Sequence, residues 1–526
     1  MRLFLKCILA IMLFGFSRAI AQCPPRPPAG TVVKDALTLS SQNGTLNAAL
    51  TLGYSVDTNG YTHYCYKYQN GASVAEAPTL RLNPGDRLLL NVADDVPIPT
   101  APQSKSAMDM MMPASSGATC GDGGTGTLQS TNVHFHGLNV PPICHQDDVL
   151  TTLIQPGDPG FQFDLTIPTT EPPGLYWYHP HVHGFTEFQV NGGAAGALIV
   201  EGMEKYRPEV AGLTERVFVI RQQYLVPWVP GPYELTLNFQ TAALPPAASP
   251  IINMKPGEKQ FWRVANATIQ DFMPLQVWVN GVPQNLELIA LDGYPLAAPR
   301  NEQTILIPPA GRAEFIVQAP AAGQSAQFEA LGYNTGPTGN PDLQQKLADI
   351  QLVSNAAAPS SQPAKSTAAP APQDHLKFAG LKSLTPTAQR KLYFSEEFGG
   401  TNGPIQFYIT VDGQPQRVFN PKEKPAITTR VGAVEDWTIE NRALETHAFH
   451  IHQIHFQLLE VNGQPVADQD LRDTIEIPYW SGKGPYNSVK VRMDFRDPTT
   501  AGTFVFHCHI LLHEDLGMMH KILVEK

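Results

Sequence analysis

The chain has 526 residues, of which 42% are hydrophobic and 16% are charged, and its formal net charge is −11. This length exceeds that of one ordinary domain and predicts about three. The acidic balance argues against nucleic-acid binding, because a phosphate backbone requires a basic protein surface.

Residues 1–21 have the features of a secretory signal peptide. Two basic residues precede an apolar run over residues 7–16, and Ala19-Ile20-Ala21 supplies the cleavage site. A transmembrane anchor is the alternative, but the run is about half of the roughly 20 residues that a span requires. We therefore expect an exported protein with no membrane span, in the periplasm or the extracellular space.

Five cysteines remain after the predicted signal peptide. An oxidising compartment favours pairing four of them into two disulfides, which leaves one over. Cys508 is the one we expect to stay unpaired, because histidines flank it on both sides. The sequence does not determine how the others pair; they are Cys23, Cys65, Cys120 and Cys144.

The rest of the chain has an all-β pattern. Short runs of alternating or β-branched residues lie between turn signals, with 48 Pro and 42 Gly in all, which predicts sandwich or barrel domains. Residues 85–94, 257–266 and 432–441 share one strand pattern at near-equal spacing, and this repeat indicates three related units.

A second repeat relates the outer units. Residues 174–181 align with residues 502–509 position for position, and both segments carry a histidine pair. The equivalent stretch near residue 323 has no histidine, so the middle unit is interpreted as a spacer or scaffold. The predicted divisions are a first domain at 22–205, a second at 206–353, an Ala/Pro/Ser-rich linker at 354–373 and a third domain at 374–526.

Ten of the sixteen histidines fall into four short clusters. They are His134 and His136; His179 and His181; His447, His450 and His452; and His507, His509 and His513. Imidazole is the commonest metal ligand, and surface histidines would not gather at repeat-related positions. The sequence therefore predicts metal binding in the first and third units.

Alternation along a strand divides these residues into two sets. In His507-Cys508-His509 the imidazoles point to one face and the thiol to the other, and His447 lies on the opposite side from His450 by the same count. The set on the thiol side is His447, Cys508, His513 and Met518, with Met519 as the alternative to Met518. Two imidazoles, a thiolate and a thioether suit a blue-copper site; zinc, the alternative, usually has a second cysteine.

The other eight histidines come in equal numbers from the first and third units. Together they can ligate three metal ions if these two units face each other. Such a cluster would exist only at the interface between the two units.

The motifs HFHG, YHPHVHG, HAFHIH and HCHILLHEDLGM closely resemble the four copper motifs of multicopper oxidases, the group that includes laccases and bilirubin oxidases. The resemblance implies three cupredoxin-like Greek-key β-sandwich domains and about four copper ions per chain, one type 1, one type 2 and a type 3 pair. It assigns His134 and His450 to the type 2 copper. It assigns six residues to the type 3 pair: His136, His179, His181, His452, His507 and His509.

The resemblance also implies an activity. Electrons from a reducing substrate would enter near Cys508, and dioxygen would be reduced to water at the histidine cluster. Phenols, aromatic amines, pigments and metal ions all remain open as substrates. A cuprous oxidase or a copper-binding protein for copper tolerance is the alternative, because the thioethers of residues 108–112 suit Cu(I).

Two carboxylates match proton-relay positions of the family. Glu514 directly follows His513, and Asp147 lies in His145-Gln-Asp-Asp, with Asp148 as its competitor. Carboxylates beside the cluster can deliver the protons that water formation requires. Glu514, Asp147 and Cys508 are the predicted catalytic residues.

Overall fold

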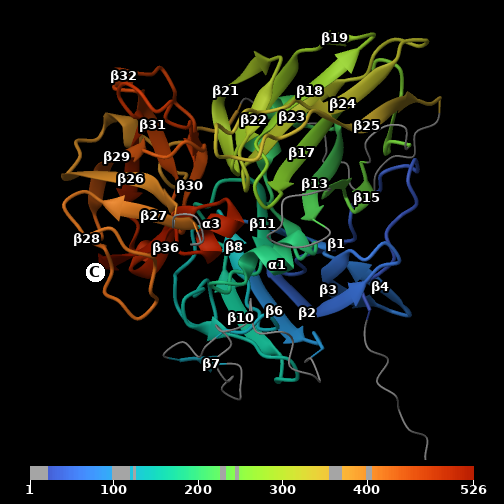
Figure 1. The fold of residues 1–526 in the computed structure, drawn as a ribbon. Helices are drawn as coiled ribbons and strands as arrows, with labels where there is room; N and C mark the ends of the chain where they lie inside the picture. Colours follow the sequence, from blue (N-terminus) through green and yellow to red (C-terminus); the bar gives the residue numbers. More distant parts are fainter. Residues whose placement is uncertain are drawn as a thin grey trace, which may run out of the picture.

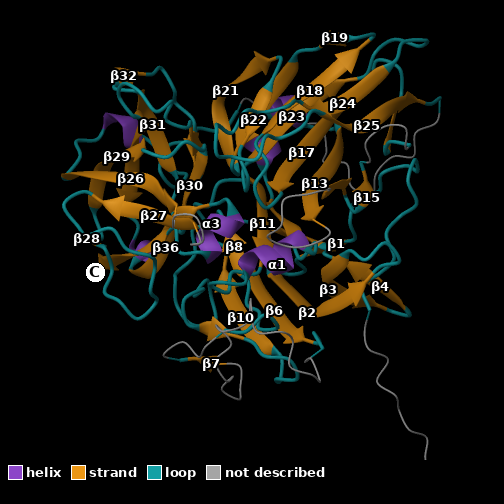
Figure 2. Cartoon of the chain, viewed as in Figure 1, coloured by secondary structure: helices purple, strands orange, loops and turns teal. Residues whose placement is uncertain are grey.

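A computed structural model describes residues 22–97, 119–121, 126–224, 233–242, 248–354, 370–398 and 405–526. The predicted signal peptide and the methionines of residues 108–112 lie outside these residues. The regular secondary structure of the described part is almost entirely β-strand, with a few short helices near its centre (Figures 1 and 2). None of its helices has the length and apolar character needed to cross a membrane.

The first unit is built from two five-stranded sheets. In spatial order, one contains β10 (Phe161–Thr166), β6 (Arg87–Asp94), β2 (Thr45–Val56), β3 (Thr62–Asn70) and β4 (Ser73–Glu76). The other contains β1 (Thr38–Ser40), β5 (Thr79–Leu82), β12 (Gly196–Val200), β11 (Gly174–His179) and β8 (His134–His136). A small ribbon pairs β7 (Thr119–Cys120) with β9 (Thr152–Leu153).

The middle unit also has two sheets. One contains β15 (Gln240–Thr241), β14 (Tyr233–Leu237), β13 (Thr214–Tyr224), β17 (Lys259–Ala267), β23 (Arg312–Gln318), β20 (Leu286–Leu291) and β21 (Tyr294–Glu302). The other contains β16 (Ile251–Met254), β25 (Gln345–Leu352), β24 (Ala326–Ala330), β18 (Met273–Val279) and β19 (Val282–Pro283), with β22 (Ile305–Ile307) beside β18.

The last unit repeats the arrangement. Its first sheet contains β27 (Ile405–Val411), β26 (Ala388–Phe398), β29 (Ala433–Asn441), β35 (Asn487–Phe495), β31 (Phe456–Val461) and β32 (Gln464–Pro465), with β33 (Leu471–Arg472) beside β31. Its second contains β28 (Ile427–Arg430), β37 (Met519–Glu525), β36 (Gly502–Cys508), β30 (His447–Ile451) and β34 (Thr474–Ile477).

The three strands of the first sequence repeat occupy equivalent positions. β6, β17 and β29 each pair in parallel with one neighbour, namely β2, β13 and β26. Each also pairs antiparallel with its other neighbour, namely β10, β23 and β35. The repeated sequence pattern therefore corresponds to a repeated strand topology, which supports three related units.

Each unit has its own apolar core, because the alternating residues of its two sheets point toward each other. A further buried cluster of Leu175, Trp177, Val217, Val219 and several alanines joins the first unit to the middle one. The units surround a centre where β8, β11, β36 and two short helices meet, α1 (Thr186–Asn191) and α3 (Leu511–Asp515) (Figure 1). A third short helix, α2 (Met203–Tyr206), follows β12.

Two disulfides link the described cysteines of the first unit. Cys23 is bonded to Cys65, and Cys120 is bonded to Cys144. Cys508 is a free, buried thiol, as its neighbours in the sequence led us to expect.

The end of the predicted linker contacts the folded units. Ala371 donates a backbone hydrogen bond to Lys205, and the Gln373 side chain donates to the carbonyl of Leu296. Residues 355–369 lie outside the described part of the chain, and the domain boundaries stay predictions.

Candidate metal centre

The pairing of β36 with β30 separates the two predicted sets of residues. Cys508 lies opposite Phe449, and His507 lies opposite His450. Directly paired residues point to the same face, so Cys508 shares its face with Phe449 and, two residues before it, His447. One strand pair thus presents a thiol side and an imidazole side.

Three side chains converge on the thiol side. The Cys508 Sγ lies 3.6 Å from Nδ1 of His447 and 3.8 Å from Nδ1 of His513, and these two nitrogens are 3.3 Å apart. All three residues are buried. Burial raises the pKa of the Cys508 thiol and lowers that of His447 to about 3, so a cation at this point would have to stabilise the thiolate.

The choice between the two methionines also follows from packing. Met518 belongs to the same buried cluster as Cys508, whereas Met519 lies opposite His507 and packs against Phe419 and Val505. The structure therefore favours Met518 as the thioether of the thiol site, by which we mean His447, Cys508, His513 and Met518.

Two carboxylates lie behind the imidazoles of the thiol site. Glu396 is 3.4 Å from Nε2 of His447, and Glu445 is 3.6 Å from Nε2 of His513. Burial raises the pKa of Glu396 to about 7, and burial together with the neighbouring Glu396 raises that of Glu445 to about 8. Since the two carboxyl groups are hydrogen-bonded to each other, they can share one proton.

The eight other histidines form one buried group, the histidine cluster. Within it, His181, His452 and His507 have ring centroids 4.8 to 5.3 Å apart. The Nε2 of His507 lies 3.4 Å from that of His181 and 3.2 Å from that of His452. This triad combines one residue of the first unit with two of the third.

A second triad consists of His136, His179 and His509, with centroids 5.1 to 5.6 Å apart. The remaining pair, His134 and His450, has centroids 6.1 Å apart. Each ring of this pair lies closer to another member of the cluster, His134 at 3.8 Å from His452 and His450 at 3.9 Å from His136, so the ligand sets that the resemblance implies stay a prediction.

Unsatisfied nitrogens show what the cluster can bind. His134, His179 and His450 each use Nδ1 for a hydrogen bond to a neighbouring group. The buried nitrogens that have no hydrogen-bond partner are Nε2 of His134, His179 and His450, Nδ1 of His136 and His452, and both nitrogens of His509. A buried nitrogen without a hydrogen-bond partner lowers the stability of the fold unless a cation binds to it.

Burial also fixes the charge of these rings. Removal from water lowers the pKa of His134, His136, His179, His452 and His509 well below its usual value. Neutral imidazoles with free lone pairs are the form that binds a metal ion, and copper is among the metals that imidazole suits. The residues therefore fit the group that the resemblance implies.

The two predicted relay acids contact different rings of the cluster. Glu514 is fully buried, with one oxygen 3.0 Å from Nδ1 of His507 and the other 3.5 Å from Nε2 of His181. Asp147 contacts Nδ1 of His134 at 3.0 Å, and burial raises its pKa to about 7. Asp148 instead bonds to Thr151, so Asp147 is the member of that pair that faces the histidines.

Sequence reasoning missed several residues that contact these rings. Glu396, Glu445 and Asp473 each touch a predicted ligand, yet none lies in one of the histidine motifs. In the sequence each of them is only an acidic residue near apolar residues. That pattern is too common to identify a site.

The four remaining nearby histidines have other neighbours. His145 stacks on Phe161, and His183 and His520 lie beside phenylalanine rings. His455 contacts Asp473 and the carbonyl of Asp292. None of these four histidines is among the predicted ligands.

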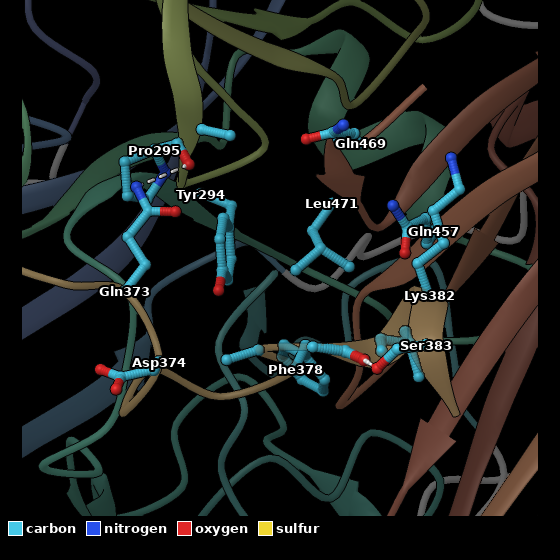
Figure 3. Close-up of a pocket in the computed structure, with 14 residues that line it drawn as sticks. Tyr294, Pro295, Gln373, Asp374, Phe378, Lys382, Ser383, Gln457, Gln469 and Leu471 are labelled. Atoms are coloured by element: carbon cyan, nitrogen blue, oxygen red, sulfur yellow. Dashed lines mark hydrogen bonds between the residues drawn. The ribbon is translucent and has the colours of Figure 1, made fainter. Parts of the chain in front are cut away.

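A surface hollow lies between the middle and last units (Figure 3). Tyr294, Phe378 and Leu471 line it, and both aromatic rings lie against His455. None of its lining residues is a predicted ligand, so we assign it no ligand.

Comparisons with known proteins agree with this site. Three family models, each described as multicopper oxidase, match residues 127–205, 177–330 and 399–526. A multicopper oxidase of Staphylococcus aureus is 23% identical over 501 residues, covering 89% of this chain and 90% of the relative. A laccase of Bacillus subtilis is 22% identical over 393 residues, covering 68% and 71%.

Solved structures share the fold. A multicopper oxidase from Campylobacter jejuni, described as a metallo-oxidase, superposes with a TM-score of 0.68 at 23% identity, covering 96% of this chain and 97% of that one. The McoA multicopper oxidase from Aquifex aeolicus gives a TM-score of 0.68 at 18% identity, covering 94% and 99%. The family matches together span more than half of the sequence, and the chain belongs to the multicopper oxidase family of copper-dependent oxidoreductases.

Proposed function

We propose that this chain is a laccase-like oxidase. It would couple one-electron oxidation of a phenolic, aromatic or metal-ion substrate at the thiol site to four-electron reduction of dioxygen to water at the histidine cluster. The observation that carries the proposal is the back-to-back arrangement in β36, where Cys508 belongs to one site and its neighbours His507 and His509 belong to the other.

The thiol site would hold a type 1 copper. His134 and His450 would hold a type 2 copper, and the two triads would hold a type 3 pair. When bound, copper supplies reversible one-electron chemistry, which organic side chains do not provide.

The residues of the chain would connect the two sites, exclude water and transfer protons. Because Cys508 is bonded through the backbone to His507 and His509, the two sites are joined by a short covalent path. Complete burial of the cluster keeps bulk water away from it. Glu514 and Asp147 lie against cluster histidines, where their carboxyl groups can pass protons on.

Glu396 and Glu445 would influence which substrates the thiol site oxidises. Both carboxyl groups contact the outer nitrogens of the imidazoles through which an electron would enter. A carboxylate at this point favours substrates that carry positive charge or that lose a proton on oxidation. Metal ions and phenols meet that condition.

Metal analysis combined with a visible spectrum and oxygen uptake tests the proposal. We expect about four copper ions per chain and a strong thiolate-to-copper band at about 600 nm. Oxygen consumption with a phenolic dye should require copper loading. A copper-loaded protein with no blue band and no oxygen uptake would contradict the proposal.

Met518→Leu should change the reduction potential of the thiol site without removing its blue absorption band. A weakly bound thioether would tune the reduction potential of a copper ion held here, and an aliphatic side chain in its place should raise that potential. Redox titration of the blue band measures the shift, with Met519→Leu as the matched control, since Met519 packs against Phe419 and Val505. A larger shift for Met519→Leu would show that the thioether is misassigned.

We also propose export to the periplasm or the extracellular space. The two disulfides of the first unit support it, because such bonds persist in oxidising compartments. Mass spectrometry of the mature N-terminus tests it, with Gln22 expected as the first residue.

A further inference from the structure

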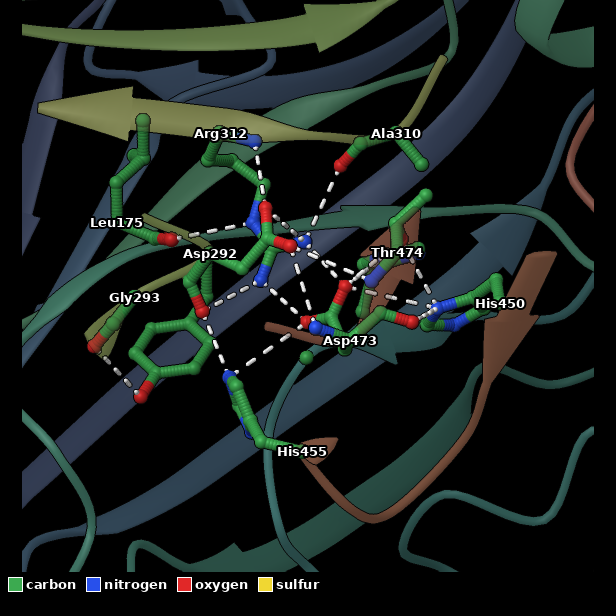
Figure 4. Close-up of polar contacts among 12 residues, drawn as sticks. Leu175, Asp292, Gly293, Ala310, Arg312, His450, His455, Asp473 and Thr474 are labelled. Carbon is green, nitrogen blue, oxygen red and sulfur yellow. Dashed lines mark hydrogen bonds and ion pairs between the residues drawn. The ribbon is translucent and has the colours of Figure 1, made fainter. Parts of the chain in front are cut away.

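The middle unit, which holds none of the predicted ligands, contributes a buried arginine that contacts a residue beside the histidine cluster. Arg312, the first residue of β23, is fully buried, and its guanidinium forms two bonds to the carboxylate of Asp473 (Figure 4). Nη1 donates to Oδ1 at 2.8 Å, and Nη2 donates to Oδ2 at 2.5 Å. This fork geometry is specific to arginine.

The other donors of Arg312 are also satisfied. They bind the backbone carbonyls of Leu175, Ala310 and Asp292 at 3.3, 3.1 and 2.9 Å. The guanidinium is thus held by the first unit, by its own unit and by Asp473 of the third unit. Its position is fixed by all three units at once.

Asp473 in turn contacts two rings of the histidine cluster. Its carboxylate lies 3.4 Å from Nε2 of His136 and 3.6 Å from Nδ1 of His450, whose Nδ1 is also 2.9 Å from the Asp473 carbonyl. Because different nitrogens are engaged, Nδ1 of His136 and Nε2 of His450 are left free. The two rings stack with centroids 3.9 Å apart.

A glycine leaves the space for this contact. Gly137 follows His136 with a φ of +87°, and a Cβ there would collide with Nη2 of Arg312 and lie 2.8 Å from Oδ2 of Asp473. The glycine of the HFHG motif is therefore explained by a side chain from the middle unit.

We propose that Arg312 and Asp473 are positioning residues that set the orientation and the metal-binding nitrogen of His136 and His450. On this view the middle unit is part of the machinery of the cluster and more than a spacer. The inference rests on the proposed function, since it concerns the copper sites that those two histidines would form.

Arg312→Met tests the proposal on the copper-loaded protein. Loss of the guanidinium frees the Asp473 carboxylate and the two rings, and groups of this kind typically contribute about 10- to 100-fold to metal affinity or activity. We expect the blue band per chain to be retained, the copper content to fall, and the type 2 signal in electron paramagnetic resonance to weaken or change. The kcat should fall about 10- to 100-fold with KM for the reducing substrate unchanged.

Two further variants separate positioning from stability. Arg312→Lys keeps the positive charge but cannot form both hydrogen bonds to Asp473. Its type 2 signal should therefore lie between those of Arg312→Met and the wild type. Arg263→Met removes another buried guanidinium of the middle unit, which pairs with Glu215 and Glu314 and with none of the cluster histidines. It should leave the type 2 signal and the copper content as in the wild type.

An unchanged type 2 signal and copper content in Arg312→Met would overturn the proposal, as would an equal copper loss in Arg263→Met. If Arg312→Met does not fold, Asp473→Asn provides the test, because it keeps the shape of the side chain and removes its charge. A wild-type signal in that variant would also overturn the proposal. A wild-type protein without any type 2 signal would instead contradict the proposed function.

Discussion

Cys508→Ser is expected to remove the blue absorption completely and to reduce substrate-driven oxygen uptake to the background rate. A serine hydroxyl is a harder, more weakly acidic donor than a thiol and cannot give the thiolate-to-copper band. The same substitution removes the sulfur at the start of the path to His507 and His509. Visible spectroscopy and an oxygen electrode measure the two effects on one sample.

The cluster provides the internal control for this variant. His507 and His509 point to the other face of β36, and serine is close to cysteine in size, so the type 2 signal should persist in Cys508→Ser. Loss of both the blue band and the type 2 signal would indicate misfolding. A variant that stayed blue and active would show that Cys508 is not in the electron-transfer site.

The two faces of the site could be predicted from the sequence because a strand alternates with a fixed period of two. That period alone separates Cys508 from His507 and His509, and the repeat of 174–181 in 502–509 identifies the two units that share the cluster. Within each of these units the two histidine motifs lie on paired strands, because β8 lies beside β11 and β30 beside β36.

Contacts between units could not be predicted in this way. Arg312 of the middle unit and Asp473 of the last unit are 161 residues apart in the sequence. Such contacts depend on how three separately folded cores pack, which no local period encodes. The disulfides Cys23–Cys65 and Cys120–Cys144 lie within the first unit, and no local period predicts these pairings either.

Glu514→Gln is expected to slow turnover by about 100-fold, at the low end of what a positioned acid or base contributes. The amide keeps the size of the side chain between His507 and His181, but unlike the carboxylate it cannot accept a proton and pass it on. Since Glu514 belongs to the cluster and not to the thiol site, only the half-reaction with dioxygen should slow. Stopped-flow bleaching of the blue band by substrate without oxygen should proceed at the wild-type rate, while its recovery on adding oxygen should be delayed.

The acids beside His134 provide a matched pair for the same measurement. Asp147→Asn should also delay the recovery, because Asp147 faces Nδ1 of His134, whereas Asp148→Asn should not, because Asp148 bonds to Thr151. A delayed recovery with Asp148→Asn but not with Asp147→Asn would reverse the assignment. If Glu514→Gln slowed bleaching and recovery equally, its effect would lie in electron entry, and proton delivery by Glu514 would be refuted.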